Sequence, residues 1–410
     1  MKRFARRVLS ISVSFGVLAA TIFIASVFNA SRGSLTKDIE QAKNSTENEE
    51  KVFNTCESKN QDKPWRVNDK ELKAVWIPFM DLQVKGEFSE QSFKQNYRNI
   101  LDRVEKTKLN AVFVQIRPFS DALYPSKIFP WSHILTGVQG KNPGFDPLKF
   151  MVDETHSRNI EFHAWIVPMR IKNVKFPEDL SELNPCVKWK REDIDKFNKY
   201  VVEDKEYTYY DPEYDEVRKI ISDGVKEVVE GYDIDGINFD DYFYPSNNLW
   251  VDKSYDEPCK KADRNDKESV IKRRKENINL LIKEIYLQIK SIKSDVVFGI
   301  CPQGNFDNAR SGGADIDTWA KYEGYVDYLC PEIYTNSVNP ILPFDRAASD
   351  WRKLVSCDKV KLYAGLGLYK TGTSQYDKGT WLDSDDVIMK QIEYLRKEGY
   401  NGFSLYSSAY

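Results

Sequence analysis

The sequence predicts an α/β protein folded as a (β/α)₈ (TIM) barrel, because two kinds of segment alternate along it. Short apolar segments typical of buried strands lie at 73–79, 110–118, 160–168, 233–240, 296–303, 326–334, 361–369 and 402–407. Amphipathic segments typical of helices lie between them, at 93–106, 147–158, 214–230, 268–294, 316–323, 344–355 and 385–397. The loops after strands 2, 3 and 4 are long, and those after helices are short. No helical pattern follows the eighth strand, so we expect the eighth helix to be short or absent.

The first 30 residues have the pattern of an N-terminal membrane anchor or signal peptide. Four basic residues precede an uncharged run from Val8 to Ala30: Lys2, Arg3, Arg6 and Arg7. As a helix such a run is about 30 Å long, enough to cross a bilayer with the basic end inside. Residues 31–68 are polar and predict a tether, and 69–410 form the predicted barrel. We therefore expect the barrel outside the cytoplasm, on the cell surface or secreted.

The composition excludes several classes of protein. The net charge of −3 gives no basic surface for nucleic acid, and three histidines are too few for a His-rich zinc site. No P-loop, dinucleotide-binding G-x-G-x-x-G or G-x-S-x-G pattern is present, so we expect no cofactor, no metal and no serine nucleophile elbow. A disulfide between Cys186 and Cys259 is one expectation from the loops, and Cys301 and Cys330 are expected as core thiols. The oligomeric state stays open.

The C-terminal strand ends are where the sequence predicts the active site, because the long loops follow them. Side chains alternate along a strand, so every second residue faces the barrel axis. The expected inward residues at or near these ends are Trp76, Arg117, His163, Trp165, Asn238, Asp240, Gln303, Glu332, Tyr369 and Tyr406.

Four aspartates fall in the segment "DIDGINFDDYFYPSN", and alternation separates them. Asp233 and Asp235 stand at the start of the strand, away from the long loops, and are expected to be solvated and structural, respectively. Asp240 is the last inward residue, and Asp241 begins the loop. An inward carboxylate at this end is expected to be catalytic, although pairing of Asp240 with Arg117 is an alternative.

Three motifs resemble the glycosyl-hydrolase-like family ten, a bacterial family of extracytoplasmic barrels. They are "RPFSDALY", "HAW" and "FDDYFYP", and the resemblance extends from about residue 71 to the C-terminus. It implies a hydrolase of peptidoglycan glycan strands. The strand-four segment is also similar to the G-x-R-x-D element of amylase-type barrels and to the D-G-x-D-x-D-x-E run of chitinases. The chain departs from the latter at Asn238 and at Tyr242, which stands where the chitinase Glu would be.

The predicted catalytic residues are Asp240, Glu332 and Asp241. Asp240 is the expected nucleophile or base. Glu332 is one candidate for the acid, although the family pattern more often has Gln there, which would make Glu332 a substrate-binding residue. In a third scheme the N-acetyl group of the sugar is the nucleophile, with Asp240 orienting it and Asp241 as the acid. The sequence leaves these schemes open, together with the retaining or inverting outcome.

The remaining candidates are expected to bind substrate: Arg117, Asp121, Tyr124, His163, Trp165, Arg170, Asn238, Tyr242, Gln303 and Tyr334. Arg117 and Arg170 suit the lactyl carboxylate of muramic acid, since guanidinium pairs with carboxylates in a bidentate way. A structural alternative exists for several of them. Arg117 pairs internally with Asp240 or Asp121, and His163 is a hydrogen-bonded core residue.

The function expected from these observations is that of an extracytoplasmic glycoside hydrolase acting on cell-wall glycan, an amino-sugar polysaccharide. Two alternatives remain at this point: a hydrolase of an exopolysaccharide such as poly-N-acetylglucosamine, and a carbohydrate-binding barrel without turnover.

Overall fold

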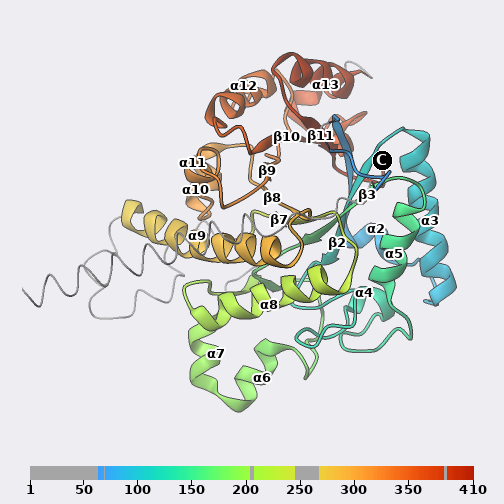
Figure 1. Ribbon diagram of the computed structural model, residues 1–410, viewed down its shortest axis with the longest axis vertical. Helices are drawn as coiled ribbons and strands as arrows, with labels where there is room; N and C mark the ends of the chain where they lie inside the picture. Colours follow the sequence, from blue (N-terminus) through green and yellow to red (C-terminus); the bar gives the residue numbers. More distant parts are fainter. Residues whose placement is uncertain (1–62, 69, 204–206, 245–266, 383–385) are drawn as a thin grey trace, which may run out of the picture. The chain divides into compact units, whose positions relative to one another are not determined.

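A closed barrel of eight parallel strands forms the centre of the protein, as predicted (Figure 1). The computed structural model describes residues 63–68, 70–203, 207–244, 267–382 and 386–410. The order around the barrel is β1-β11-β10-β9-β8-β7-β3-β2. The strands are β1 (Leu72–Ile77), β2 (Ala111–Arg117), β3 (Glu161–Ile166), β7 (Gly236–Asp240), β8 (Val297–Cys301), β9 (Tyr328–Leu329), β10 (Lys361–Leu366) and β11 (Gly402–Leu405).

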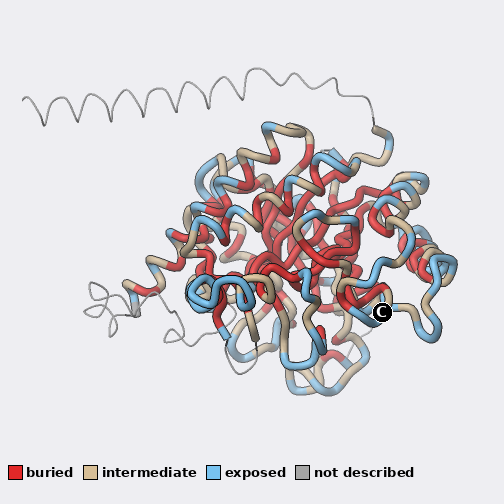
Figure 2. The backbone as a smooth tube through the Cα atoms, turned by 90° about the horizontal axis from the view of Figure 1, so that it is seen from below, coloured by how far each residue is buried: buried red, intermediate tan, exposed pale blue. Residues whose placement is uncertain are grey.

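The strands are apolar on both faces because the barrel buries both. All seven residues of β2 are buried. Its outward residues Val112 and Val114 belong to the large cluster of core side chains that also includes residues of the surrounding helices. Its inward residue Phe113 joins a second cluster of mainly inward-facing residues, with Trp76 and Trp165. Figure 2 shows the result as buried backbone in the middle of the molecule.

Helices follow seven of the eight barrel strands. They are α2 (Phe79–Leu82), α3 (Glu90–Lys106), α4 (His133–Thr136), α5 (Pro147–His156), α8 (Asp215–Gly231), α9 (Lys267–Ile292), α10 (Phe306–Ser311), α11 (Ile316–Trp319), α12 (Phe344–Leu354) and α13 (Val387–Lys397), with the 3₁₀ turns η4 (Leu368–Lys370) and η5 (Asp377–Gly379). Helix α3 begins three residues before its predicted start, because Ser89 and Ser92 form a capping box there. In the described residues after β11, 406–410, no helix forms, which agrees with the prediction.

The long loop after β3 forms a small subdomain that the sequence analysis did not resolve. Strands β4 (Arg170–Asn173), β5 (Val201–Glu203) and β6 (Tyr207–Tyr210) make an antiparallel sheet in the order β4-β6-β5. Helices α6 (Pro185–Glu192) and α7 (Ile194–Tyr200) precede β5, and Figure 1 shows them below α8. This sheet places Arg170 beside the C-terminal ends of β2 and β7, where its Nε donates to the carbonyl of Pro118 at 2.9 Å.

Residues 63–68 lie at the N-terminal end of the barrel, where a tether was predicted. The ring of Trp65 stacks on His156 with 4.2 Å between centroids, and its Nε1 donates to Asp235 at 3.1 Å. Val67 is buried among the inward-facing side chains, and its backbone N–H donates to Glu161. The predicted boundary at residue 69 is therefore too late: these six residues belong to the barrel rather than to a tether.

Some predictions concern residues outside the described ranges. The predicted membrane segment 1–30 and most of the predicted tether lie there. None of the helices in the described ranges is long and apolar enough to span a bilayer. Cys186 is a buried free cysteine, which contradicts its predicted disulfide with Cys259, a residue outside the described ranges. Cys301 and Cys330 are buried core thiols, as predicted.

Candidate active site

Three carboxyl groups gather at the C-terminal mouth of the barrel. Asp240 ends β7 and Asp241 follows it, and both are almost fully buried. Glu332 lies just beyond β9. It extends the parallel pairing of the barrel strands through single β-bridges to Gln303 and to Gly365. The negative charges of Asp240 and Asp241 both raise the pKa of Glu332, which places the three groups within electrostatic reach of one another. The structure thus brings together the three residues predicted to be catalytic.

Asp240 is the most readily ionised of the three. The indole Nε1 of Trp165 donates to its Oδ2 at 3.2 Å, and the backbone N–H of Tyr242 donates to its Oδ1 at 3.4 Å. Burial raises the pKa of Asp240 to about 6, while the positive charge of Arg170 and these two hydrogen bonds oppose the rise. Asp240 is therefore largely a carboxylate at neutral pH.

Asp241 and Glu332 hold their protons more tightly. Burial and the neighbouring charge of Asp240 raise the pKa of Asp241 to about 7, against a hydrogen bond from the Gln303 N–H to its Oδ2 at 3.0 Å. Burial and the charges of both aspartates raise the pKa of Glu332 well above its ordinary value, against a hydrogen bond from Tyr334. Neighbouring negative charges repel one another, so ionising all three carboxyl groups costs free energy. At neutral pH at least one of the three therefore stays protonated.

Tyrosines surround Glu332 on the side of β9, β10 and β11. The rings of Tyr334 and Tyr406 lie 5.7 Å apart, and Tyr369 lies 6.1 Å from Tyr334 and 6.0 Å from Tyr406. Burial, and to a smaller extent the charge of Glu332, raises the pKa of Tyr369 and of Tyr406 to about 12. Both tyrosines therefore stay neutral and present hydroxyl groups beside the carboxyl cluster. Tyr334 was predicted as a substrate-binding residue, and Tyr369 and Tyr406 as inward residues.

Arg170 and Tyr242 also lie near the carboxyl cluster. The guanidinium carbon of Arg170 lies 5.4 Å from the ring centre of Tyr242 and 4.7 Å from that of Phe119. Tyr242 is 40% exposed, so its ring is partly open to solvent. The two residues combine one positive charge with an open aromatic face, which is the kind of surface that binds an anionic sugar.

The structure places Arg117 away from the barrel mouth. The strand register shifts between Gln115 and Arg117, so Arg117 leaves the inward alternation. Its guanidinium is buried under α8, where it lies 4.4 Å from the ring centre of Phe129 and close to Gly224. Arg117 therefore has neither the predicted place beside Asp240 nor the one beside Asp121.

Asp121 and Tyr124 are also buried in the loop after β2 rather than open to the mouth. Asp121 has no exposed surface and accepts from Gln139 at 3.2 Å, while His133 Nδ1 lies 3.1 Å from the same oxygen. The hydroxyl of Tyr124 donates to the carbonyl of Gly224 at 3.3 Å. In this arrangement both residues fix the loop and do not meet the carboxyl cluster.

His163 and Asn238 face inward but lie one layer deeper. The ring of His163 covers Gly236, and its Nδ1 lies 3.2 Å from the hydroxyl of Tyr328. The amide of Asn238 donates to the same hydroxyl at 3.0 Å. Both are almost fully buried, and each precedes the residue nearer the mouth on its own strand, Trp165 on β3 and Asp240 on β7. The core-residue alternative for His163 matches this position.

Lys370 is a site residue that the sequence analysis missed. Its Nζ donates to the carbonyl of Tyr334 and lies over the rings of Tyr369, at 5.6 Å, and Tyr376, at 4.7 Å. Burial lowers its pKa. Its only signal in the sequence was its place directly after Tyr369 at a predicted strand end. Lys370 supports the tyrosines and does not belong to the carboxyl cluster itself.

The arrangement suits proton transfer by carboxyl groups. One carboxylate and one protonated carboxyl held close together are the minimum for acid–base cleavage of a glycosidic bond. Within the part of the chain that the structure describes, no three His, Cys, Asp or Glu side chains are arranged to hold a metal ion. The groups that the described residues offer at the mouth are carboxyl groups and tyrosine hydroxyls.

Comparison with known proteins agrees with this chemistry. The model of the family Glycosyl hydrolase-like 10 matches residues 71–383. The chain is 38% identical over 354 residues to "Glycosyl hydrolase YngK" of Bacillus subtilis (strain 168), a match that covers 80% of this chain and 66%, just under two thirds, of that protein. It is 31% identical over 354 residues to "Glycosyl hydrolase DigH" of Escherichia coli (strain K12), covering 78% of this chain and 76% of that protein.

Solved structures share the fold. The catalytic domain of β-amylase from Paenibacillus polymyxa superposes with a TM-score of 0.53 at 11% identity, over 83% of this chain and 93% of that one. The α-L-fucosidase isoenzyme 2 from Paenibacillus thiaminolyticus superposes with a TM-score of 0.50 at 14% identity, over 82% of this chain and 46% of that one. At these identities the likeness establishes the TIM-barrel fold alone.

Proposed function

The chain belongs to the Glycosyl hydrolase-like 10 family, and from that premise we propose that it is a glycoside hydrolase cleaving the glycan strands of bacterial peptidoglycan. The observation that carries the proposal is the cluster of Asp240, Asp241 and Glu332 at the barrel mouth, with raised pKa values. Raised values of this kind are typical of catalytic acids and bases.

The roles follow from the order in which the three groups lose their protons. Asp240, with a pKa of about 6, is the nucleophile or base, because it is ionised at neutral pH. Glu332 is the acid that protonates the leaving oxygen, because burial and two neighbouring carboxyl groups raise its pKa and keep it protonated. Asp241 supplies the larger of those two charge effects and so sets the acid strength of Glu332. The substrate-assisted scheme, with Asp241 as acid, is the alternative that the variants below distinguish.

Support for the substrate comes from the sequence motifs and from the borders of the site. The motifs "RPFSDALY", "HAW" and "FDDYFYP" resemble those of peptidoglycan glycan hydrolases. Arg170 beside Tyr242 would pair with the lactyl carboxylate of muramic acid. The tyrosines around Glu332 would offer hydroxyl partners to the neighbouring sugars.

The place of action that we propose is outside the cytoplasm, with residues 1–30 as anchor or signal peptide. The basic start and uncharged run of this segment support it. Protease added to intact cells would degrade the barrel if it lies outside. A barrel that survives until the cells are lysed would contradict this placement.

The experiment that tests the activity uses purified glycan strands from which the peptides have been removed. The full chain, in a polyoxyethylene detergent, is incubated with the strands, and the release of reducing ends is measured. Asp240→Asn should lower the rate at least a thousandfold, whereas Asp233→Asn, a change at the exposed opposite end of the same segment, should not. No release by the parent chain, or equal release by Asp240→Asn, would overturn the proposal.

A further inference from the structure

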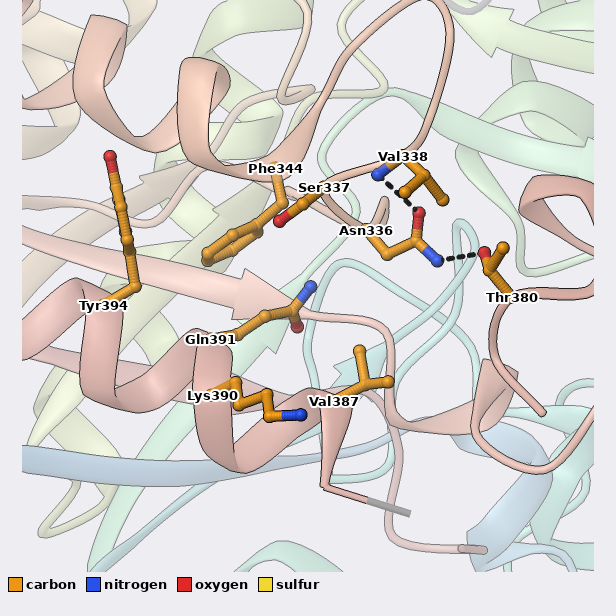
Figure 3. Close-up of a pocket in the computed structure, with 9 residues that line it drawn as sticks. All are labelled: Asn336, Ser337, Val338, Phe344, Thr380, Val387, Lys390, Gln391 and Tyr394. Atoms are coloured by element: carbon orange, nitrogen blue, oxygen red, sulfur yellow. Dashed lines mark hydrogen bonds between the residues drawn. The ribbon is translucent and has the colours of Figure 1, made fainter. Parts of the chain in front are cut away.

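A pocket lies beside the two helices that precede β10 and β11, and none of the three clustered carboxyl groups lines it. It has a volume of about 380 Å³ and opens between the loop after β9, helix α12 and helix α13 (Figure 3). The residues that line it are Asn336, Ser337, Val338, Phe344, Thr380, Val387, Lys390, Gln391 and Tyr394. We call it the α12–α13 pocket. Its lining contains aromatic, amide and hydroxyl groups but no carboxyl group.

Gln391 points into this pocket with an unused hydrogen-bond acceptor. The residue is only 4% exposed, and Figure 3 shows its amide between the ring of Phe344 and the side chain of Val387. Its Nε2 donates to the carbonyl of Thr335 at 2.9 Å, which fixes the amide's orientation. Its Oε1 is buried and has no hydrogen-bond partner among the residues that the structure describes. A buried acceptor without a partner destabilises the protein, so a ligand that donates to it would gain from that contact.

The other polar groups of the pocket are largely occupied, and the pocket is close to neutral. Asn336 donates to Thr380 at 2.5 Å and accepts from the backbone of Val338 at 3.2 Å. Lys390 forms an ion pair with Asp386 at 2.9 Å, so its charge is balanced. A ligand of this pocket therefore needs a hydrogen-bond donor for Gln391 rather than a charge.

We infer that the α12–α13 pocket binds a neutral, N-acetylated sugar residue of the glycan at a site separate from the carboxyl cluster. The O–H and N–H groups of such a sugar are donors for Gln391 Oε1. The rings of Phe344 and Tyr394 meet edge to face, with 5.9 Å between their centres, and the half-buried ring of Tyr394 gives the sugar's C–H groups an apolar contact. The volume is at the small end of ligand pockets and suits one or two sugar rings. The choice of a glycan rests on the proposed function.

The pocket is joined to the active site by the segment that carries Glu332. Gln391 holds Thr335, the residue after Tyr334, and Tyr334 hydrogen-bonds Glu332. Because no carboxyl group lines the pocket, a sugar bound there is held and not cleaved. The pocket would therefore hold a long glycan chain near the barrel mouth. This lowers the KM for the polymer and leaves kcat unchanged.

The test compares two tryptophan substitutions. Ser337→Trp fills the pocket, whereas Met389→Trp adds the same ring on an exposed position of α13 outside it. Binding of N,N′-diacetylchitobiose is measured by titration calorimetry on the full-length Asp240→Asn chain in polyoxyethylene detergent, with and without each change. We expect Ser337→Trp to remove one binding site per chain and Met389→Trp to remove none. Equal stoichiometry in all three proteins, or no binding by the Asp240→Asn chain, would overturn the inference.

A kinetic comparison adds a readout that a merely structural role would not give. With Asp240 intact, Ser337→Trp should raise the KM for long glycan strands at least fivefold, with kcat and the KM for short oligosaccharides unchanged. An unchanged KM for long strands would count against the pocket and would leave the hydrolase proposal standing. Conversely, loss of one binding site in a protein that hydrolyses no glycan would support the pocket and refute the hydrolase.

Discussion

The indole of Trp165 on β3 donates a hydrogen bond to the carboxylate of Asp240 on β7, with 3.2 Å between Nε1 and Oδ2. The two strands are neighbours in the barrel, and Trp165 pairs in register with Asn238, two residues before Asp240. This bond is one of the forces that limit the rise in the pKa of Asp240. It therefore connects the packing of the barrel interior to the charge of the proposed nucleophile or base.

Replacing Trp165 by Phe should shift the acid limb of the pH–rate profile. Asp240 works as a carboxylate, so activity is lost as the pH falls through its pKa of about 6. Removing a donor that stabilises the charged form raises that pKa, and the limb should move up by about 0.5–1 pH unit. The pH dependence of kcat/KM on glycan strands measures it.

The matched control for this change is Trp76→Phe. Trp76 packs against Trp165 in the barrel interior, and its indole donates to Ser404 rather than to a carboxyl group. Its replacement also removes an indole from the core but leaves the Asp240 bond in place. If both variants keep the parent's acid limb, the Trp165 bond does not control the charge of Asp240.

Variants of Glu332 and Asp241 should identify the acid. Glu332→Gln should lower the rate on glycan strands about 10²–10⁴-fold and abolish the alkaline limb, since no proton donor remains to titrate. Aryl glycosides, whose leaving group needs no protonation, should be affected far less. Asp241→Asn removes the charge that most raises the pKa of Glu332, so its alkaline limb should move to lower pH. The reverse pattern, with selective rescue of Asp241→Asn by aryl glycosides, would make Asp241 the acid.

Much of the barrel was predictable because its strands have a simple signature. Each is a short apolar run buried on both faces, and alternation along regular strands such as β7 correctly predicted the inward positions of Asn238 and Asp240. The structural role predicted for Asp235 also agrees with the structure, since it accepts from the Phe162 N–H at 2.8 Å. These inferences needed only the regular alternation of side chains within single strands.

The failures come from places where local regularity ends. The prediction for Arg117 was wrong because the strand register shifts between Gln115 and Arg117, which turns the Arg117 side chain out of the barrel interior. No residue type in the sequence marks such a shift. The sheet of β4, β5 and β6 was missed because its short strands, RIKN, VVE and YTYY, do not lie in sustained apolar runs. The α12–α13 pocket depends on how two helices and a loop pack, and alternation within single segments carries no information on that.

Asp235→Asn should affect stability rather than catalysis. Asp235 is fully buried at the N-terminal end of the barrel, with His156 Nε2 at 2.7 Å and Arg66 Nε at 3.4 Å from its oxygens. Removing one partner of such a group leaves buried charge uncompensated, and we expect a loss of about 3 kcal/mol in the free energy of unfolding at neutral pH. Urea denaturation measures it.

The pH dependence of that loss follows from the lowered pKa of Asp235. The ionised group contributes its stability above the unfolded-state pKa of about 4, and the contribution is lost as the pH falls through the lower folded-state value. The gap between parent and Asp235→Asn should therefore be full at pH 7 and narrow below pH 4. Asp233→Asn, at a half-exposed ion pair with Lys63, should cost less than about 0.5 kcal/mol. Equal effects of the two changes would contradict this assignment.

Gly224→Ala tests the position found for Arg117. Gly224 lies in the middle of α8, where alanine is normally the better helix former by about 1 kcal/mol. Here a Cβ would come within 2.3 Å of Arg117 Nη1 and 2.7 Å of Phe129 Cε2, and buried Arg117 has no free space to withdraw into. Overpacking should outweigh the propensity gain, with a net loss of about 1–3 kcal/mol in the free energy of unfolding, measured by urea denaturation.

The control for this change is Gly231→Ala, at the end of the same helix. No atom lies within 4 Å of the new Cβ there, so this change should be neutral or slightly stabilising. Equal stability of the two variants would mean that Arg117 does not lie against α8.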